Sequence, residues 1–195
     1  VCISPTRFFI EEPVYDEFIK SFKSHVEAIN VGDGLDSKST MGPLVADRRL
    51  EVMEDFISDA VSSGGEVISG GGRGQSPGSF FEPTLIRDVP DTAKIMIEEP
   101  FGPVAPSASF SSIDEIIERA NSLPFGLASY AFTSNPRTSQ ILKSEIESGM
   151  LAINSMHIHS VETPFGGLKH SGYGYEGSIE GLEAFLVTKY SSEIY

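Results

Sequence analysis

The chain has 195 residues, of which 39% are hydrophobic and 22% charged, and its 14 basic and 28 acidic side chains give a formal net charge of −14. This length is sufficient for one sizeable domain with a buried core. The acidic balance argues against nucleic acid and anionic membrane surfaces as partners, and no apolar run approaches the roughly 18 residues that a membrane helix needs.

Apolar and polar residues predict short strands and helices that alternate along most of the chain. In chain order we expect a strand over residues 7–10, a helix from 13 to a stop at 32–34, a helix over 47–62, strands over 66–69, 80–86, 95–97 and 104–110, a helix from 113, a strand over 127–133, a helix from 136, a strand over 150–154, a helix over 179–184 and a final strand over 185–190. Helices between short apolar strands predict an α/β fold in which helices cover both faces of a sheet, giving three layers.

Capping residues mark several of the predicted helix starts. Pro13 suits a first helical turn, Ser112 and Glu115 have the spacing of a capping box, and Asn135 with Pro136 has the form of an N-cap and first helical residue. The strand over 150–154 is apolar enough to be buried on both faces. The inward stripe of the helix over 47–62 is predicted to be Leu50, Met53, Ile57 and Ala60. For the first helix two stripes are open, namely Val14, Phe18, Phe22 and Val26, or Tyr15, Phe18, Phe22 and Ile29.

Three segments could carry chemistry. Cys2, the only cysteine, is either a thiolate nucleophile or a small buried apolar residue. The carboxylates of residues 98–104 either accept both hydroxyl protons of a ribose or belong to a solvated turn. In residues 164–174, dense glycines predict tight turns or close approach of the backbone to a ligand or another chain. The alternative for that segment is an ordinary irregular loop.

Other patterns point away from chemistry. The glycine-rich stretch 70–78 lacks the Lys-Ser/Thr pair and the following helix of a phosphate-binding loop, so we expect a surface turn there. The four histidines match no zinc spacing, so we expect no metal; they are His25, His157, His159 and His170. A single cysteine also excludes an internal disulfide and favours a reducing compartment, which we take to be the cytoplasm.

The order of the motifs is more informative than any one of them. Cys-Ile-Ser-Pro-Thr-Arg at 2–7 is followed by Glu-Glu-Pro-Phe-Gly-Pro-Val at 98–104 and by Pro-Phe-Gly-Gly-Leu-Lys-His-Ser-Gly-Tyr-Gly at 164–174. Between them stand Met-Gly-Pro-Leu at 41–44, Phe-Glu-Pro-Thr-Leu at 81–85 and Phe-Gly-Leu-Ala at 125–128. Over essentially its whole length the chain thus resembles the C-terminal half of the aldehyde dehydrogenase superfamily. Residues 160–164 and 176–184 look most like the succinate-semialdehyde dehydrogenase branch.

The resemblance implies an enzyme that oxidises an aldehyde to a carboxylate with NAD or NADP. Cys2 would be the nucleophile, forming a thiohemiacetal and then a thioester, while its backbone N–H helps to hold the oxyanion. Glu99 matches the glutamate that accepts hydrogen bonds from the nicotinamide ribose, and Phe101 matches the aromatic residue beside the nicotinamide. Phe165 matches a residue near the aldehyde pocket.

The resemblance also bears on the substrate. In the succinate-semialdehyde branch, a serine in the loop before the glycine motif helps to bind the substrate carboxylate. His159 stands at that position here, and Ser160 follows it. A protonated His159 could bind a carboxylate; the alternative is that His157 and His159 simply line a loop. The small-molecule partner that we expect is therefore an aldehyde.

Domain organisation and assembly follow from the same resemblance. Residues 1–174 would belong to the catalytic domain, and residues 175–195 would form a tail whose strand over 185–190 joins a sheet of a homodimer or homotetramer. The dinucleotide-binding domain, general-base glutamate and oxyanion-hole asparagine of the family lie upstream of the nucleophile. Since none of these is present and there is no initiator methionine, we expect a fragment that is inactive alone. Two alternatives stay open, namely a non-catalytic oligomerisation or interaction module and a CoA-acylating or phosphate-dependent relative.

Overall fold

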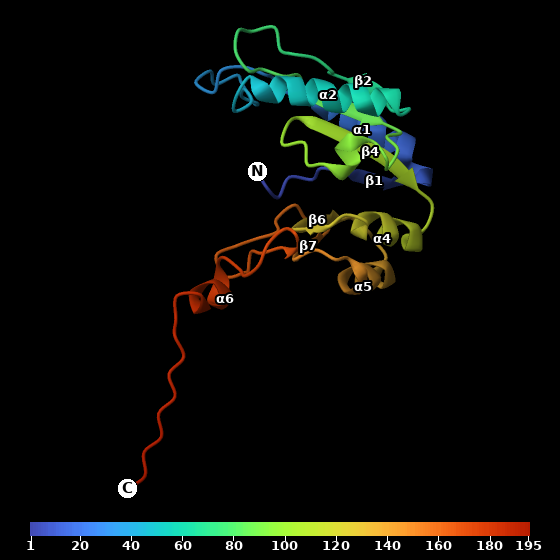
Figure 1. Cartoon of the computed structure of the whole chain (residues 1–195). Helices are drawn as coiled ribbons and strands as arrows, with labels where there is room; N and C mark the ends of the chain where they lie inside the picture. The colour runs from blue at the N-terminus through green and yellow to red at the C-terminus, as the bar shows by residue number, and fades with distance from the viewer. The chain divides into compact units, whose positions relative to one another are not determined.

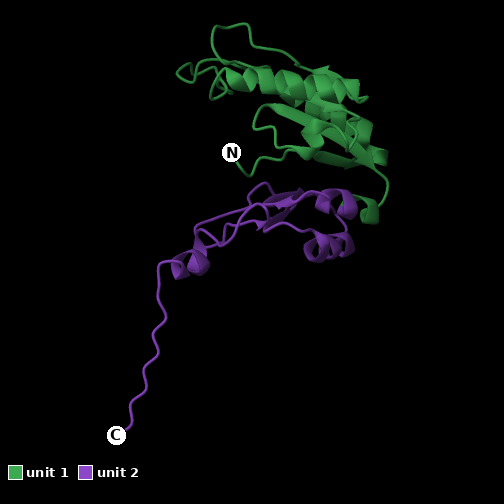
Figure 2. Ribbon diagram, in the orientation of Figure 1, with its two compact units in different colours: residues 1–116 green, residues 117–195 purple.

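The computed structural model describes every residue from Val1 to Tyr195. The chain forms two compact units, Val1–Ile116 and Ile117–Tyr195 (Figure 2). The first unit contains β1 (Phe8–Glu11), the 3₁₀ turn η1 (Glu12–Val14), α1 (Tyr15–Glu27), α2 (Arg48–Ser62), β2 (Glu66–Ser69), β3 (Thr84–Arg87), α3 (Lys94–Ile97) and β4 (Val104–Phe110) (Figure 1). Helix α4 (Ile113–Asn121) continues into the second unit, which contains β5 (Phe125–Gly126), β6 (Ala128–Ala131), α5 (Pro136–Glu145), β7 (Met150–Ile153), β8 (Leu168–Lys169) and α6 (Ser178–Glu183). The predicted division between residues 1–174 and 175–195 stays a prediction.

The first unit is built on a four-stranded sheet in the order β1-β4-β3-β2. Strand β4 runs parallel to both β1 and β3, whereas β2 pairs antiparallel with β3 at the edge. In the centre of the sheet Thr84, Leu85 and Ile86 are all buried. Burial of successive residues is typical of a strand covered on both faces.

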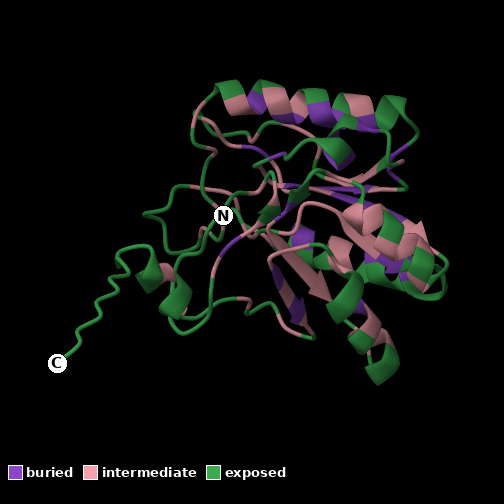
Figure 3. Cartoon of the chain, turned by 60° about the horizontal axis from the view of Figure 1, so that its bottom comes forward, coloured by how far each residue is buried: buried purple, intermediate pink, exposed green.

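Two hydrophobic clusters lie on opposite faces of this sheet. Side chains alternate between the faces of a strand: Leu85 packs with α1, whereas its neighbour Ile86 packs with α2. The first cluster contains Leu50, Met53, Phe56, Ile57, Ala60, Phe81, Ile86, Val89, Ala93, Ile95, Met96, Val104 and Ala108. The second contains Ile10, Tyr15, Ile19, Val26 and Leu85. The predicted α/β fold with three layers is therefore confirmed, and Figure 3 shows the alternation of buried and exposed residues along its helices.

The inward face of α1 differs from both predicted stripes. Tyr15, Ile19 and Val26 are buried, whereas Val14 and Phe18 are 50% and 40% exposed. Val14 belongs to the 3₁₀ turn η1, so the α-helix begins at Tyr15, two residues later than the predicted start at residue 13. In α2, by contrast, all four residues of the predicted stripe are buried, as expected.

One predicted strand is a helix. Residues 95–97 form part of α3, whose first backbone N–H donates to the Asp59 carboxylate of α2 at 2.6 Å. Ile95 and Met96 are both buried while Ile97 is 46% exposed, so their burial does not alternate as it would in a strand. A short apolar run cannot distinguish a strand from a buried helical turn. The strand predicted over 80–86 is also shorter, and its regular part begins at Thr84.

The second unit has two small sheets. Strands β5 and β8 are antiparallel, and β6 and β7 are parallel. Asn135 caps α5 as predicted, because its side-chain oxygen accepts hydrogen bonds from the backbone N–H groups of Arg137 and Thr138. In β7, Met150 and Ala152 are buried while the residues between and after them are partly exposed, so this strand is not buried on both faces.

The C-terminal residues 186–195 lie outside helix and strand. Phe185, Val187 and Tyr190 are between 87% and 96% exposed. A strand forms only when its backbone groups pair with a neighbour, so the predicted oligomerisation strand over 185–190 stays a prediction for the assembled protein. No helix in the structure has the length and apolar character needed to cross a membrane.

Candidate active site

Cys2 lies in a turn at the start of the chain. The Ser4 backbone N–H donates to the Val1 carbonyl at 3.1 Å and closes this turn. The cysteine is exposed and forms no disulfide. Access is one of the two requirements for a reactive thiol, the other being the thiolate form. The interpretation of Cys2 as a small buried apolar residue is therefore wrong within this chain.

Glu99 and Phe101 lie in the segment that joins α3 to β4. Both side chains are exposed, Phe101 to 55%, and Glu99 has no hydrogen bond or ion pair within the chain. The backbone of Phe101 has φ 40°, in the left-handed region that residues with a side chain seldom adopt. Because residues 95–97 are helical, Glu99 follows a helix end and not a strand end.

Helix α2 and strand β3 hold this segment in place. The Arg49 guanidinium donates through Nη2 to the Pro100 carbonyl. Gly102 lies directly against the buried Met53 side chain, with no room for a Cβ. The Thr84 backbone N–H donates to the Pro103 carbonyl at 2.8 Å and continues the sheet toward the segment. Three neighbouring residues are thereby fixed from the protein interior, while Glu99 and Phe101 face outward.

In the second unit, the three residues predicted to bind substrate line one open pocket of about 420 Å³. The rings of His159 and Phe165 meet edge to face, with centroids 5.7 Å apart. Two backbone hydrogen bonds of 2.8 Å join Phe165 to Glu176, and Glu176 also lines the pocket. The full lining is His159, Ser160, Val161, Thr163, Phe165, Glu176 and Gly177.

The two polar candidates in this pocket, Ser160 and His159, differ in whether their side chains already have a hydrogen-bond partner. The Ser160 hydroxyl donates to the Glu162 carboxylate at 2.7 Å, and this bond lowers the pKa of Glu162. The His159 imidazole has no hydrogen-bond partner in the chain, and its ring packs edge to face against that of Phe165. A negatively charged ligand would therefore meet a free imidazole at His159, whereas Ser160 is already committed to a carboxylate.

The glycines of segment 164–174 have two structural reasons. Gly166 and Gly167 are crowded by the chain itself, whereas Gly172 and Gly174 have open space around them and positive φ angles of 129° and 78°. A Cβ on Gly149 would clash with the Gly166 carbonyl, and one on Gly166 would lie 2.5 Å from the Tyr175 ring. The Ser171 hydroxyl accepts the Gly126 backbone N–H at 2.9 Å. Tight turns or close approach of the backbone to a ligand or another chain were predicted here. The structure has positive φ at Gly172 and Gly174, and the groups that approach Gly166 belong to this same chain.

Lys169 is a structural residue of the same segment that the sequence did not single out. Its ammonium donates to the carbonyls of Asn121 and Leu123 at 2.9 and 3.1 Å and pairs with the Glu147 carboxylate. Within a family motif a lysine could have been assigned to a ligand. Its three contacts assign it instead to the connection between α4, α5 and β8.

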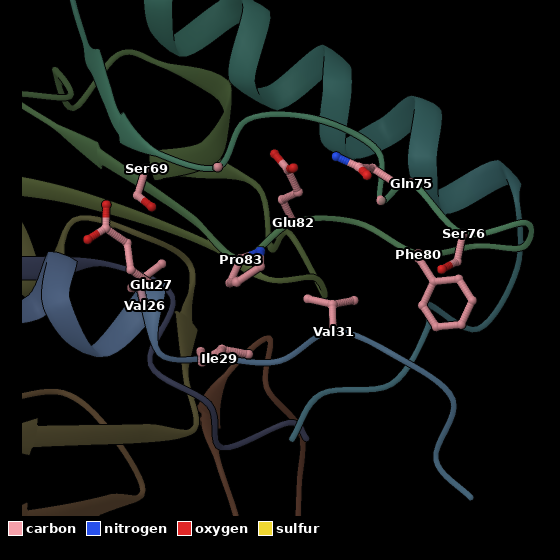
Figure 4. Close-up of a pocket in the computed structure, with 12 residues that line it drawn as sticks. Val26, Glu27, Ile29, Val31, Ser69, Gln75, Ser76, Phe80, Glu82 and Pro83 are labelled. Atoms are coloured by element: carbon pink, nitrogen blue, oxygen red, sulfur yellow. The ribbon is translucent and has the colours of Figure 1, made fainter. Parts of the chain in front are cut away.

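A second pocket, of about 390 Å³, lies in the first unit beside the end of α1 (Figure 4). It contains none of the predicted site residues. Its lining includes the carboxylates Glu27 and Glu82 and no lysine or arginine, which disfavours a phosphate ligand. The stretch 70–78 on its rim has bends and one isolated bridge, at Arg73, and no helix follows it, so it is irregular surface structure as expected.

The structure thus brings some of the candidates together. His159, Ser160 and Phe165 share one pocket in the second unit, while Cys2, Glu99 and Phe101 all belong to the first unit. No hydrogen bond, ion pair or ring contact joins Cys2 to Glu99 or Phe101. No group of three or more His, Cys, Asp or Glu side chains is arranged to hold a metal ion.

Comparisons with known proteins agree on one family. The sequence model described as "Aldehyde dehydrogenase family" matches residues 1–191. A 4-(hydroxymethyl)benzenesulfonate dehydrogenase of Comamonas testosteroni is 41% identical over 189 residues, which are 97% of this chain and 39% of that protein. The crystal structure of a succinate-semialdehyde dehydrogenase from Burkholderia pseudomallei is 36% identical with a TM-score of 0.94, covering 96% of this chain and 39% of the other. A 3,6-anhydro-L-galactose dehydrogenase solved with NAP is 39% identical with a TM-score of 0.91, covering 95% and 40%.

The chain therefore spans about 39% of the length of the relatives that it matches. The likeness extends over nearly all of this chain, including the segments around residues 2, 99 and 165.

Proposed function

Because the chain belongs to the aldehyde dehydrogenase family, we propose that it supplies the nucleophile, part of the cofactor site and part of the substrate pocket of an aldehyde-oxidising enzyme. Relatives of the chain use NAD or NADP. The observation that carries the proposal is the exposed, unpaired thiol of Cys2 at the start of a chain that matches this family through residue 191.

In the proposed reaction the Cys2 thiolate bonds to the aldehyde carbon and the carbonyl oxygen becomes an oxyanion. The backbone N–H of Cys2 stabilises that charge, and collapse of the thiohemiacetal with loss of hydride leaves a thioester on the sulfur. Water then breaks the C–S bond, giving a carboxylate and restoring the thiol. Covalent attachment makes the hydride loss intramolecular, which removes much of its entropic cost.

Glu99 and Phe101 would hold the nicotinamide end of the cofactor. Glu99 has a carboxylate that no group of this chain uses, and Phe101 offers an exposed ring two residues away. A carboxylate can accept hydrogen bonds from two neighbouring hydroxyls of a ribose. When bound, the nicotinamide supplies the hydride acceptor, while these residues fix its position.

For the substrate we propose an aldehyde that carries an anionic group. The names of two relatives refer to organic anions, a benzenesulfonate and a succinate semialdehyde. In this chain the free imidazole of His159 beside Phe165 is the group that could receive such an anion when protonated. Activity of the full-length native protein on succinate semialdehyde and benzaldehyde distinguishes the cases, since equal kcat/KM values would contradict the anionic substrate.

We also propose that the 195-residue chain alone forms no NADH or NADPH, since relatives are about two and a half times as long. Incubation of the purified chain with aldehyde and either cofactor tests this, and measurable reduction would contradict it. A reduced Cys2 is needed throughout, which is consistent with the predicted cytoplasmic location.

The exposed apolar residues of the tail favour an additional assembly role. The side chains of Phe185, Val187 and Tyr190 are exposed in the isolated chain and would be covered if residues 185–190 paired with another subunit. We propose that this strand joins subunits of a homodimer or homotetramer. The role accompanies the catalytic function, and persistence of full activity after alkylation of Cys2 in the full-length protein would leave assembly as the only function of the chain.

A further inference from the structure

Arg49 lies at the start of α2 in an environment that stability alone does not explain. One donor, Nη2, bonds to the Pro100 carbonyl, while the Nε–H is buried without any hydrogen-bond partner. Arg49 forms no salt bridge. Burying a charged group that has an unsatisfied hydrogen-bond donor is unfavourable for folding. The hydrogen bond to Pro100 therefore calls for an explanation other than stability.

The contact falls between the two residues proposed to hold the cofactor. Pro100 is buried, whereas Glu99 before it and Phe101 after it are exposed. The orientation of the peptide group between Pro100 and Phe101 determines the φ angle of Phe101. That angle is 40°, and such left-handed conformations persist only where neighbouring groups enforce them.

Met53 provides the second constraint from the same face of α2. Arg49 and Met53 are four residues apart, so they are neighbours on the helix surface. Arg49 holds the Pro100 carbonyl on one side of Phe101, and Met53 packs against Gly102 on the other side. One face of α2 therefore fixes the backbone immediately before and after Phe101.

We propose that Arg49 is a positioning residue for the cofactor site, acting through the Pro100 carbonyl on Glu99 and Phe101. This inference rests on the proposed function, because it assumes that Glu99 and Phe101 bind the nicotinamide end of NAD or NADP. Arg49 lies outside the predicted site, and a positioning role explains why an arginine with an unsatisfied donor stands at this position. The role requires a hydrogen-bond donor at residue 49 and does not require contact with the cofactor.

The test compares Arg49→Met, Arg49→Lys and the control Arg48→Met in the full-length native protein. Arg48 is the adjacent residue, is exposed and forms no hydrogen bond or ion pair with the segment. Loss of the hydrogen bond should raise the KM of the cofactor, and the Kd of NADH or NADPH measured by fluorescence, by about tenfold in Arg49→Met. The aldehyde KM should change by less than about twofold, Arg49→Lys should recover most of the cofactor affinity, and Arg48→Met should match the wild type.

An unchanged cofactor KM and Kd in Arg49→Met would overturn the inference. So would equal increases of cofactor and aldehyde KM in Arg49→Met and Arg49→Lys together with a lower Tm, since that pattern indicates a general structural role. If Arg49→Met does not fold, Arg49→Ala takes its place as the variant without a donor. A cofactor Kd about tenfold above that of Arg49→Lys then supports the inference, and a Kd equal to that of Arg48→Met overturns it. Activity that depends on Cys2 but is indifferent to Arg49 overturns this inference alone, whereas activity independent of Cys2 overturns the proposed function.

Discussion

Gly149 packs against the backbone carbonyl of Gly166, leaving no space for a side chain between them. The first residue precedes β7, and the second belongs to the glycine motif after the substrate pocket. Phe165, the neighbour of Gly166, lines that pocket. This contact therefore holds the backbone next to a pocket residue, and it explains why residue 149 is glycine without reference to a ligand.

Replacement of Gly149 by alanine should lower the free energy of unfolding by about 1–3 kcal/mol, because the new methyl group must displace backbone atoms. Urea unfolding of the full-length protein measures the change. Gly42→Ala is the matched control, since a Cβ there meets nothing within 4 Å. Equal stability of the two variants would show that the Gly149–Gly166 contact is not constrained.

Tyr15→Phe should change stability in a manner that depends on pH. The Tyr15 hydroxyl accepts the Asp88 backbone N–H at 2.9 Å and lies 3.3 Å from Ser107 Oγ. Burial raises the pKa of Tyr15 from its usual value of 10.0, so the folded state favours the neutral phenol. Stability from this group is fully present below pH 10.0 and is lost as the pH rises through the higher folded pKa.

At neutral pH, Tyr15→Phe should cost about 1–2 kcal/mol because the Asp88 N–H loses its acceptor. Above pH 10.0 its stability should decline less steeply than that of the wild type. Denaturant unfolding at pH 7 and across the alkaline range measures both effects. Tyr173 is fully exposed, and Tyr173→Phe serves as the control. Parallel alkaline declines for wild type and Tyr15→Phe would contradict the assigned cause.

Lys169→Met should destabilise the protein by about 1–3 kcal/mol, since two backbone carbonyls would lose their donor. These are the carbonyls of Asn121 and Leu123. Lys143→Met, at an exposed lysine of α5, is the control. Thermal unfolding of both variants provides the measurement. A loss of activity at unchanged stability would assign Lys169 to the substrate or cofactor and would contradict its structural role.

Residues 185–190 should contribute to the subunit interface of the full-length protein. Val187→Asp places a charge on residues 185–190 and should shift the full-length protein toward smaller species, because a carboxylate is costly to bury in a subunit interface. Light scattering after size-exclusion chromatography measures the mass. Ser191→Asp adds the same charge beyond the predicted strand. An unchanged mass in the Val187 variant would contradict an interface through this segment.

The sequence was a good guide to local structure wherever the pattern was long or had a specific cap. The stripe of α2 and the Asn135 cap were both predicted because periodicity and capping depend on nearby residues. The strand predicted over residues 95–97 was wrong. A run of three residues has no measurable period, and Asp59 of α2 stabilises a helical turn there. The inward face of α1 was predicted only in part: Tyr15 and Val26, one from each predicted stripe, are buried, whereas Phe18 is 40% exposed and Ile19, which neither stripe contains, is buried.

For the candidate site, the motifs located the residues but not what positions them. Glu99, Phe101 and Phe165 could be identified from short sequence motifs. Arg49 and Lys169 could not, since each acts through backbone carbonyls at least 46 residues away in the sequence. Every residue type has a backbone carbonyl, so the sequence does not show which carbonyl accepts a hydrogen bond. Such contacts can be identified only from the structure.

Mass spectrometry of the peptide that contains Cys2 tests directly whether this residue is the nucleophile. The peptide is taken from full-length protein quenched with acid during turnover of an aldehyde with NAD or NADP. The Cys2 sulfur should carry the acyl group of the substrate, hydroxylamine should remove it, and Cys2→Ser should show neither the adduct nor turnover. Full turnover by Cys2→Ser, or an acyl group on another residue, would contradict the assignment of Cys2 as the nucleophile.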